Sequence, residues 1–369
     1  MSQQQIKGQR VRVLIVDDSA TARVALRGAL GCDPSIEIVG EVQRAESVLA
    51  MVERLRPDLV TMDLYLGAHS GVDVAREIMQ SLPTPIIMVT GGDPRHPTLV
   101  YDALRAGVME VAGKPPSPHH ADYEHSRQAL ARTVRTLARV PVIARRSARY
   151  PGARESTDTS APKWSRPSAL PSRHRVRSDA TRRPTPRLMV LGASTGGPPV
   201  LCQILRGVPR GTAVPIVLVQ HLATGFTDGF ARWMEAQTGL SAVVVRERTR
   251  LEGGRIHIAG EERHLQVTSQ MYVEPDEGPA VNFHRPAIDV LFRSAARHFA
   301  GDVLAVLCTG LGADGAEGMR ALFDAGARTI AQSLESCAVA SMPRRALQLG
   351  AVKRCLAPEE IAAELRSLA

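Results

Sequence analysis

A glycine-rich turn around Ser194 is the stretch of this 369-residue chain whose residue types could do chemistry. The apolar residues 188–191 predict a buried strand, and residues 198–205 predict a helix that starts with a proline, which suits a first helical turn. Between them, Gly192, Ser194 and Gly196 form the pattern G-x-S-x-G, in which a serine hydroxyl is presented at a strand end. The helix N-terminus adds N–H groups that suit a developing oxyanion. The turn therefore predicts a nucleophilic serine.

Two other interpretations of the same turn stay open. Glycine-rich turns after a strand often bind a phosphate or a nucleotide, and others only close a strand–helix unit. Residues 192–197 match neither the dinucleotide fingerprint G-x-G-x-x-G nor the G-K-[S/T] ending of a Walker loop. Residues further along the chain favour the serine.

A serine hydroxyl needs a base, and His221 and Asp314 can complete such a set. His221 follows the apolar run 214–219, and Asp314 lies in a glycine-rich stretch after the apolar run 303–308. If both runs are strands of one parallel sheet, their ends bring the three side chains to the same edge. There the histidine would take the serine proton and the carboxylate would orient the imidazole and stabilise the imidazolium. The order Ser, His, Asp differs from that of α/β-hydrolases, so we expect a different doubly wound sheet.

Other histidines compete for the role of base, and Asp314 could instead cap the helix that follows it. The competing residues are His257, His264, His284 and His298. His284 is the strongest of these, because it lies in a charged loop. We favour His221 because it ends a core strand, as Ser194 does.

A second set of polar residues follows the predicted strands of the first 115 residues. Strand and helix patterns alternate five times there, which predicts a doubly wound α/β domain with ligands at the strand ends. Clustered carboxylates favour a hard cation such as Mg²⁺, while a lysine and a hydroxyl nearby would hold a phosphoryl group. A single aspartate at such a place would be an ordinary helix cap. The residues at these ends are Asp17, Asp18, Asp63, Thr90 and Lys114.

Charge and composition divide the chain into two folded parts and a linker. Residues 144–187 hold twelve Lys or Arg and three Asp or Glu, which accounts for the whole net charge of +9. This segment is rich in Pro and Ser and predicts a disordered tether. We therefore predict a five-stranded doubly wound domain at 1–139, a basic linker at 140–186, and a mostly parallel doubly wound α/β domain with a β-hairpin at 187–369.

Several classes of protein are disfavoured by the same composition. No run of 18 apolar residues predicts a membrane-spanning helix, and the first residues lack the apolar core of a signal peptide. The five cysteines are scattered without a C-x-x-C pair, which favours reduced thiols in a cytoplasmic protein over a zinc site. Outside the linker the net charge is zero and no helix-turn-helix pattern occurs, so we expect no nucleic-acid partner.

Residues 10–139 resemble a two-component receiver domain. The resemblance implies that Asp63 accepts a phosphoryl group from a histidine kinase, and that Thr90 and Lys114 contact that group. It also implies that Mg²⁺ is surrounded by three carboxylates and one backbone carbonyl, those of Asp17, Asp18, Asp63 and Tyr65.

The chain departs from the usual receiver pattern at two positions. Gly67 stands where receivers usually carry proline, four residues after the acceptor. Val111 stands where many carry an aromatic residue, so the usual rotation of that aromatic side chain cannot transmit the signal here.

The whole set of motifs resembles the chemotaxis response-regulator methylesterases, in which a receiver precedes a protein-glutamate methylesterase domain. The motifs that match are 192–197, 220–221, 282–292, 309–315 and 336–343. Leu334 departs from the family pattern, which usually has an acidic residue there. The resemblance implies a metal-independent triad with two backbone N–H oxyanion donors; the residues are Ser194, His221 and Asp314, with Thr195 and Leu311 as donors.

The resemblance also implies a function. It predicts phosphorylation-controlled hydrolysis of glutamate γ-methyl esters, and possibly deamidation of glutamines, on methyl-accepting chemotaxis receptors. It further predicts a chemotaxis histidine kinase as phosphodonor and a cytoplasmic protein that meets the membrane only through receptors. The alternative is a response regulator whose second domain only binds phosphate, a nucleotide or a macromolecule.

Overall fold

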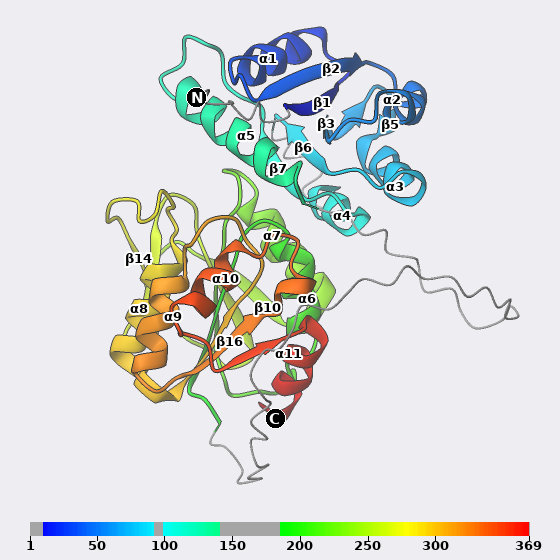
Figure 1. Ribbon diagram of the computed structural model, residues 1–369. Helices are drawn as coiled ribbons and strands as arrows, with labels where there is room; N and C mark the ends of the chain where they lie inside the picture. The colour runs from blue at the N-terminus through cyan, green and yellow to red at the C-terminus, as the bar shows by residue number, and fades with distance from the viewer. Residues whose placement is uncertain (1–9, 92–98, 141–184, 369) are drawn as a thin grey trace, which may run out of the picture. The chain divides into compact units, whose positions relative to one another are not determined.

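The protein is described by a computed structural model that covers residues 10–91, 99–140 and 185–368 (Figure 1). The predicted linker at 140–186 lies almost wholly outside the described residues. Within the described ranges, no helix is both long and apolar enough to cross a membrane.

The N-terminal domain is built on five parallel strands in the order β2-β1-β3-β6-β7, as the strand–helix alternation predicts. A small antiparallel pair, β4 and β5, was not predicted. The elements are β1 (Val11–Val16), α1 (Ala20–Gly31), β2 (Ile36–Val42), η1 (Ala45–Ser47), α2 (Val48–Leu55), β3 (Leu59–Met62), β4 (Tyr65–Leu66), β5 (His69–Ser70), α3 (Gly71–Ser81), β6 (Ile86–Thr90), α4 (Leu99–Ala106), β7 (Glu110–Gly113) and α5 (Tyr123–Leu137).

Alternate residues along these strands enter the cores on opposite faces of the sheet. Leu14 and Val16 of β1 join the cluster that includes α2, α3 and α4, whereas Val13 and Ile15 join the one that includes α1 and α5. This is the period-two pattern of a strand buried on both sides. The sheet order changes direction between β1 and β3, so the ends of these two strands form the switch point where such folds bind ligands.

The last strand of this sheet begins later than the sequence predicts. The residues at 108–111 predict a short strand, but β7 spans Glu110–Gly113. The reason is that the Val108 N–H donates to the Ala103 carbonyl at 3.1 Å, which closes the end of α4. The chain can extend into the sheet only after this bond.

The C-terminal domain is built on seven parallel strands in the order β10-β12-β9-β8-β15-β16-β17, with a separate antiparallel sheet, β11-β14-β13. The pair β13 and β14 is the predicted hairpin. The elements are β8 (Leu188–Ala193), α6 (Gly197–Leu205), β9 (Ile216–Gln220), α7 (Thr227–Thr238), β10 (Ser241–Val245), β11 (Thr249–Arg250), β12 (Arg255–Ala259), β13 (His264–Val267), β14 (Tyr272–Asp276), α8 (Ile288–Phe299), η2 (Ala300–Asp302), β15 (Val303–Leu307), α9 (Ala316–Asp324), β16 (Arg328–Gln332), η3 (Leu334–Ser336), α10 (Ser341–Gln348), β17 (Arg354–Leu356), α11 (Pro358–Leu365) and η4 (Arg366–Leu368).

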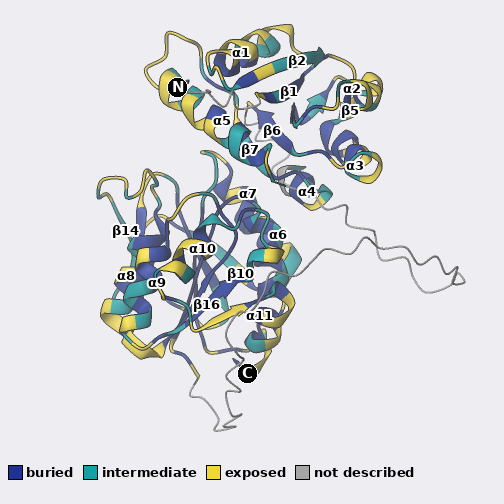
Figure 2. Cartoon of the chain, viewed as in Figure 1, coloured by how far each residue is buried: buried dark blue, intermediate teal, exposed yellow. Residues whose placement is uncertain are grey.

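Helices cover both faces of this sheet. Met189 and Leu191 of β8 pack with α6, α7 and α11, and Leu188 and Val190 pack with α8, α9 and α10. Figure 2 shows the strands as buried and the outer faces of the helices as exposed. The strand order reverses between β8 and β15, so the switch point lies where the turn at Ser194 begins.

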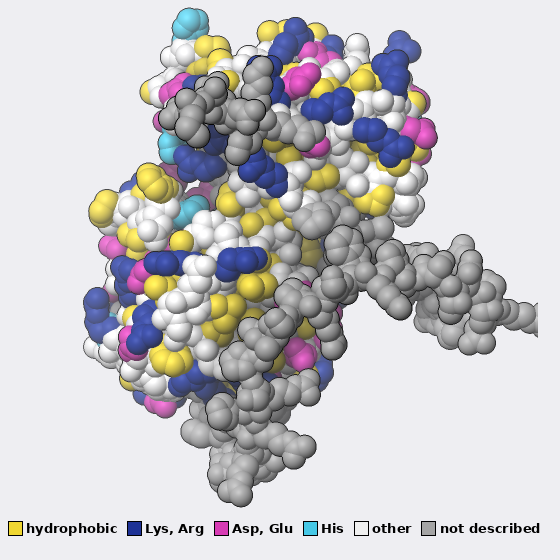
Figure 3. Space-filling view, in the orientation of Figure 1, with side chains coloured by type: hydrophobic (Ala, Val, Ile, Leu, Met, Phe, Trp, Pro, Cys, Tyr) yellow, Lys and Arg dark blue, Asp and Glu magenta, His cyan; other side chains and the backbone are white. Residues whose placement is uncertain are grey.

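Figure 3 shows the charged side chains on one face of the molecule. On the face drawn in Figure 3, Lys and Arg lie among Asp, Glu and apolar side chains and form no single basic patch. This agrees with the zero net charge outside the linker segment.

Candidate active site

Ser194 lies in the tight turn between β8 and α6, as the G-x-S-x-G pattern predicts. Its N–H donates to the Thr309 carbonyl at 3.0 Å, and its carbonyl accepts from the Gly197 N–H at 2.8 Å. Gly196 has a φ of +75°, and a Cβ there would lie 2.5 Å from the Ala338 Cβ. Only glycine fits this conformation and this space. The bond to Thr309 ties the turn to the chain that follows β15.

His221 lies directly beside this turn because of the parallel register of β8 and β9. Ala193 pairs with Gln220, and the His221 N–H donates to the Ala193 carbonyl at 3.1 Å. Ser194 is therefore the first residue after β8, and His221 is the first residue after β9. The ends of these two strands are aligned. The prediction that strand ends bring these residues to one edge agrees with this geometry.

The imidazole of His221 pairs with Asp314 through one nitrogen. Nε2 lies 3.0 Å from Asp314 Oδ2, and the His221 side chain is only 11% exposed. Since the carboxylate accepts a hydrogen bond, Nε2 carries the proton and the lone pair is on Nδ1. Nδ1 is buried and has no hydrogen-bond partner among the described residues, so its bond to the Ser194 hydroxyl is not formed in this structure. Catalytic hydrogen bonds are often long before substrate binds.

The Asp314 carboxylate is fully buried and receives three backbone N–H groups. Oδ2 accepts from Ile288 at 2.7 Å, and Oδ1 accepts from Asp289 at 3.1 Å and Gly315 at 2.9 Å. Ile288 and Asp289 open α8, so the carboxylate sits at the N-terminus of that helix. The sequence suggested a possible cap on the helix that follows Asp314, but the helix it caps precedes it in the chain.

These contacts keep Asp314 ionised. Burial alone would raise its pKa, but the hydrogen bond and charge of His221 and the N–H groups of Ile288 and Asp289 outweigh burial and lower the pKa below its ordinary value of 3.8. The positive end of the α8 dipole acts in the same direction. A carboxylate that stays charged can stabilise a neighbouring imidazolium.

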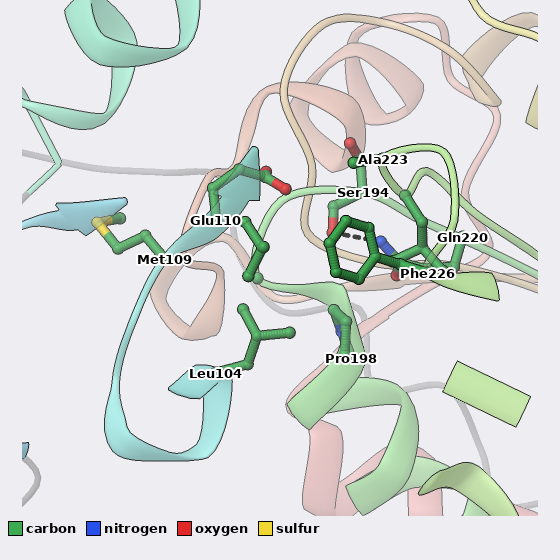
Figure 4. A pocket seen from close by; sticks show the side chains of 11 residues that line it. Leu104, Met109, Glu110, Ser194, Pro198, Gln220, Ala223 and Phe226 are labelled. Atoms are coloured by element: carbon green, nitrogen blue, oxygen red, sulfur yellow. Dashed lines mark hydrogen bonds between the residues drawn. The ribbon is translucent and has the colours of Figure 1, made fainter. Parts of the chain in front are cut away.

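Gln220 connects the serine turn to the histidine, a role that the sequence did not reveal. Its Nε2 donates to the Ser194 carbonyl and to the His221 carbonyl, both at 2.9 Å. Figure 4 shows the Gln220 side chain directed at Ser194. The Ser194 carbonyl thus has two donors, which fix the plane of its peptide. Because that peptide is trans, the Thr195 N–H points to the opposite side.

The peptide that carries the second predicted oxyanion donor, the Leu311 N–H, is also fixed by two hydrogen bonds to its carbonyl. The Gly310 carbonyl accepts from the Met342 N–H at 3.2 Å and the Ser341 hydroxyl at 2.9 Å, which orients the following Leu311 N–H away from α10. A Cβ on Gly310 would lie 2.8 Å from the Ser194 Cβ, so this peptide runs directly past the serine. The role of Thr195 and Leu311 as donors stays a prediction.

Three of the competing histidines are placed where they cannot serve Ser194. His257 is buried in β12 and its Nδ1 donates to the Ile216 carbonyl at 3.1 Å. Both nitrogens of His264 are engaged, since Nε2 donates to the Pro279 carbonyl at 2.9 Å and Nδ1 accepts from Ala287 at 3.1 Å. His298 is exposed in the last turn of α8, a helix about 18 Å long whose other end holds Asp314.

The fourth histidine, His284, lies against His221. The two ring centroids are 3.9 Å apart and the rings are tilted by 11°, so they are stacked. Burial, together with the neighbouring His221, lowers the pKa of His284 to about 4. The loop that carries His284 therefore does reach the site, but the His284 ring covers the ring of His221, the base.

The carboxylates predicted for the first domain do converge. Oxygen atoms of Asp17, Asp18 and Asp63 all lie within 4.8 Å of one another. Lys114 Nζ lies 2.8 Å from Asp17 Oδ2 and 2.7 Å from Asp63 Oδ2. A set of three hard oxygen donors beside an ammonium group fits Mg²⁺ and a phosphoryl group.

The pKa values of this cluster follow from burial and pairing. Burial raises the pKa of Asp63, and the bonds to Lys114 oppose this without reversing it. Burial would lower the pKa of Lys114, but its ion pairs with Asp17 and Asp63 outweigh burial and raise it. Lys114 therefore stays charged and neutralises part of the cluster.

The remaining predicted residues lie around Asp63. Thr90 ends β6 and is buried, and its carbonyl accepts from the Lys114 N–H at 2.9 Å. Tyr65 pairs with Ser70 in the small strand pair that follows Asp63.

Gly67, the departure from the usual proline, has a visible consequence. Its N–H donates to Asp18 Oδ2 at 2.9 Å, a bond that proline could not make. The glycine thus ties the loop after the acceptor to one carboxylate of the cluster.

Two family models match this chain, one over each domain. The family model described as CheB methylesterase matches residues 189–365, and the one described as response regulator receiver domain matches residues 13–121. The match to the receiver model ends before α5, and the match to the methylesterase model spans all seven strands of the second sheet except the first residue of β8.

Relatives match along nearly the whole chain. The protein-glutamate methylesterase/protein-glutamine glutaminase 4 of Geobacter metallireducens is 36% identical over 97% of this chain and 99% of its own length. The corresponding protein 3 of Anaeromyxobacter dehalogenans is 37% identical over 96% of this chain and 98% of its own length. The crystal structure of the Thermotoga maritima CheB methylesterase catalytic domain is 30% identical, covers 50% of this chain and 99% of that domain, and has a TM-score of 0.48.

Proposed function

The chain belongs to the protein-glutamate methylesterase/protein-glutamine glutaminase family, and on that premise we propose that it hydrolyses glutamate γ-methyl esters on methyl-accepting chemotaxis receptors. Deamidation of receptor glutamines is the same acyl transfer with ammonia as the leaving group. The observation that carries the proposal is the pair of His221 Nε2 and Asp314 Oδ2, 3.0 Å apart, at the sheet edge that presents Ser194.

Acylation uses Ser194 as the nucleophile. Its Oγ attacks the γ-carbonyl carbon while His221 Nδ1 takes the hydroxyl proton, and the Asp314 carboxylate stabilises the imidazolium that forms. The Thr195 and Leu311 N–H groups bind the oxyanion of the tetrahedral intermediate. The bond between carbon and methoxy oxygen then breaks, and His221 returns its proton to the leaving oxygen, which departs as methanol.

Deacylation repeats these steps with water. His221 Nδ1 takes a proton from the water as its oxygen attacks the acyl carbon. The ester bond to Ser194 breaks, the serine oxygen recovers the proton, and the glutamate carboxylate is released. This chemistry is complete with the chain's own groups and water.

The first domain supplies control. Asp17, Asp18 and Asp63, together with the backbone carbonyl of Tyr65, would hold Mg²⁺, which when bound offsets the charge of the incoming phosphoryl group. Asp63 accepts that group from the phosphohistidine of a chemotaxis kinase, so a P–N bond breaks and a P–O bond forms. Lys114 and Thr90 then contact the phosphoryl oxygens. The protein acts in the cytoplasm and meets the membrane only through receptors.

The direct experiment measures methanol release from methylated receptor by the full-length protein. We expect release by the unmodified chain and a loss of at least several hundred-fold in Ser194→Ala, because the variant lacks the oxygen that attacks the ester and forms the acyl-enzyme. Unchanged release in Ser194→Ala would refute the esterase assignment. A small-molecule phosphodonor with Mg²⁺ should increase release by the unmodified chain and should have no effect on Asp63→Asn.

A further inference from the structure

We propose that His284 is a positioning residue whose ring, stacked on the imidazole of His221, fixes the plane in which His221 exchanges protons with Ser194. The inference rests on the proposed esterase function and adds to it a residue that acts through His221. The two rings lie 3.9 Å apart between centroids and are nearly parallel, with an angle of 11°.

An imidazole needs two constraints if its free nitrogen is to point in one direction. The bond from Nε2 to Asp314 holds one edge of the His221 ring, but the ring can still tilt about that bond. A second flat ring against its face removes the tilt. With edge and face both held, the lone pair on Nδ1, which has no other partner among the described residues, keeps a fixed direction.

The loop that carries His284 is built to hold this ring in place. The His284 N–H donates to the Val281 carbonyl at 2.9 Å and the Val281 N–H donates back at 3.1 Å, which closes a tight turn. Its two central residues, Asn282 and Phe283, have φ values of +52° and +66°. Such values are uncommon for residues other than glycine and persist where the surrounding contacts require them.

The turn is tied to the same helix end that holds Asp314. Asn282 Nδ2 donates to Asp289 Oδ2 at 2.8 Å, and Asp289 is fully buried, with its Oδ1 accepting from Gly318 at 2.6 Å. The Asp289 N–H in turn donates to Asp314 at 3.1 Å. The first turn of α8 therefore sets the position of Asp314, at the edge of the His221 ring, and of the turn that carries His284, on the face of that ring.

His284 does not compete with His221 as the base. Its pKa of about 4 leaves it neutral at pH 7 and a poor match for proton transfer at that pH. A neutral ring also avoids placing a second positive charge against the imidazolium during the reaction. The stacked ring thus contacts His221 without competing for the proton that His221 takes.

The test compares His284→Leu, which removes the flat ring, with His284→Phe, which keeps it but has no nitrogen. We expect His284→Leu to lower kcat for methanol release about 10- to 100-fold, since small misplacements of a catalytic group cost this much, with KM changed less than about 3-fold. His284→Phe should recover most of the lost rate. His298→Leu, at an exposed histidine of the same domain, is the matched control and should keep the rate of the unmodified chain.

Each other outcome is decisive. If His284→Phe is as slow as His284→Leu, a ring nitrogen is required and the positioning role is wrong. If His284→Leu keeps its rate, or if KM rises while kcat is unchanged, the stack has no role in orienting the base. Thermal unfolding of both variants shows whether a loss comes from unfolded protein. The unmodified chain is measured in the same assay. If it releases no methanol, the esterase proposal itself fails, and this outcome is distinct from a loss seen only in the His284 variants.

Discussion

Asp314→Asn is the substitution that tests the site most sharply, because it keeps the shape of the side chain and changes its hydrogen bonding. The carboxylate accepts from three backbone N–H groups and from His221 Nε2. An asparagine has one oxygen acceptor and an NH₂ group that only donates. At least one of these four donors must then face another donor, and no negative charge is left for the imidazolium.

Two magnitudes follow from these contacts. The unpaired buried donor should lower the free energy of unfolding by about 1–3 kcal/mol. Catalysis should suffer far more, because His221 is left with the wrong tautomer and an unsupported positive charge. The corresponding change in other enzymes with this arrangement lowers kcat by about 10⁴-fold.

The assay is methanol release from methylated receptor, with unfolding of both proteins followed in urea. We expect kcat to fall by roughly four orders of magnitude while most of the protein stays folded. Asp324→Asn, at the exposed end of α9, is the control: it loses only the charge of an exposed ion pair with Arg320, so it should keep kcat and change the free energy of unfolding by less than about 1 kcal/mol. A rate for Asp314→Asn within tenfold of the unmodified chain would refute the role of this carboxylate.

The lowered pKa of Asp314 predicts how the stability of the folded protein depends on pH. The pKa of Asp314 is lowered in the folded protein, mainly because the bonds from His221 and α8 outweigh burial. The ionised group therefore contributes stability that is fully present above the unfolded value of 3.8 and is lost as the pH falls through the lower folded value. We expect the stability difference between the unmodified chain and Asp314→Asn to shrink as the pH falls below 3.8. A difference that stays constant from pH 7 to pH 3 would contradict this.

Two further predictions concern the local geometry of each site, the first at Ser194 and the second at Asp63. Gln220→Leu removes the donors to the Ser194 and His221 carbonyls, so it should cost about 1–3 kcal/mol of stability and lower kcat about tenfold, measured by urea unfolding and methanol release. An unchanged kcat would show that this bridge does not position the site. Gly71→Ala places a Cβ 2.0 Å from the Asp63 carbonyl oxygen, so the backbone at the phosphoryl acceptor must move and phosphorylation by a small phosphodonor should slow. A labelling rate equal to that of the unmodified chain would contradict this.

The sequence predicts the framework because strand ends are local features. The apolar runs before Ser194 and His221 identify two parallel strands, and a parallel register places the residues that follow them side by side. The glycines around Ser194 mark a turn that only they fit. Asp63 and Lys114 follow strands in the same way, and they lie 2.7 Å apart in the fold.

The sequence does not predict contacts that depend on how a distant element docks. Asp314 caps α8, whose first residue lies 26 positions earlier, and no local pattern shows which helix end a carboxylate will meet. His284 is visible as a candidate base, yet its actual place on the face of His221 depends on a turn anchored through Asn282. The hydrogen bonds from Gln220 to the Ser194 and His221 carbonyls depend on the direction of one side chain. The alternation along a strand specifies only the face of the sheet on which that side chain lies.

The measurement that tests the central claim most directly is a double-mutant cycle between His221→Ala and Asp314→Asn, followed by kcat for methanol release. If Asp314 acts only through the imidazole that it holds, the double variant should be as slow as His221→Ala alone, because groups that act as a unit are not additive. Losses that multiply in the double variant would contradict the claim, since each residue would then contribute independently.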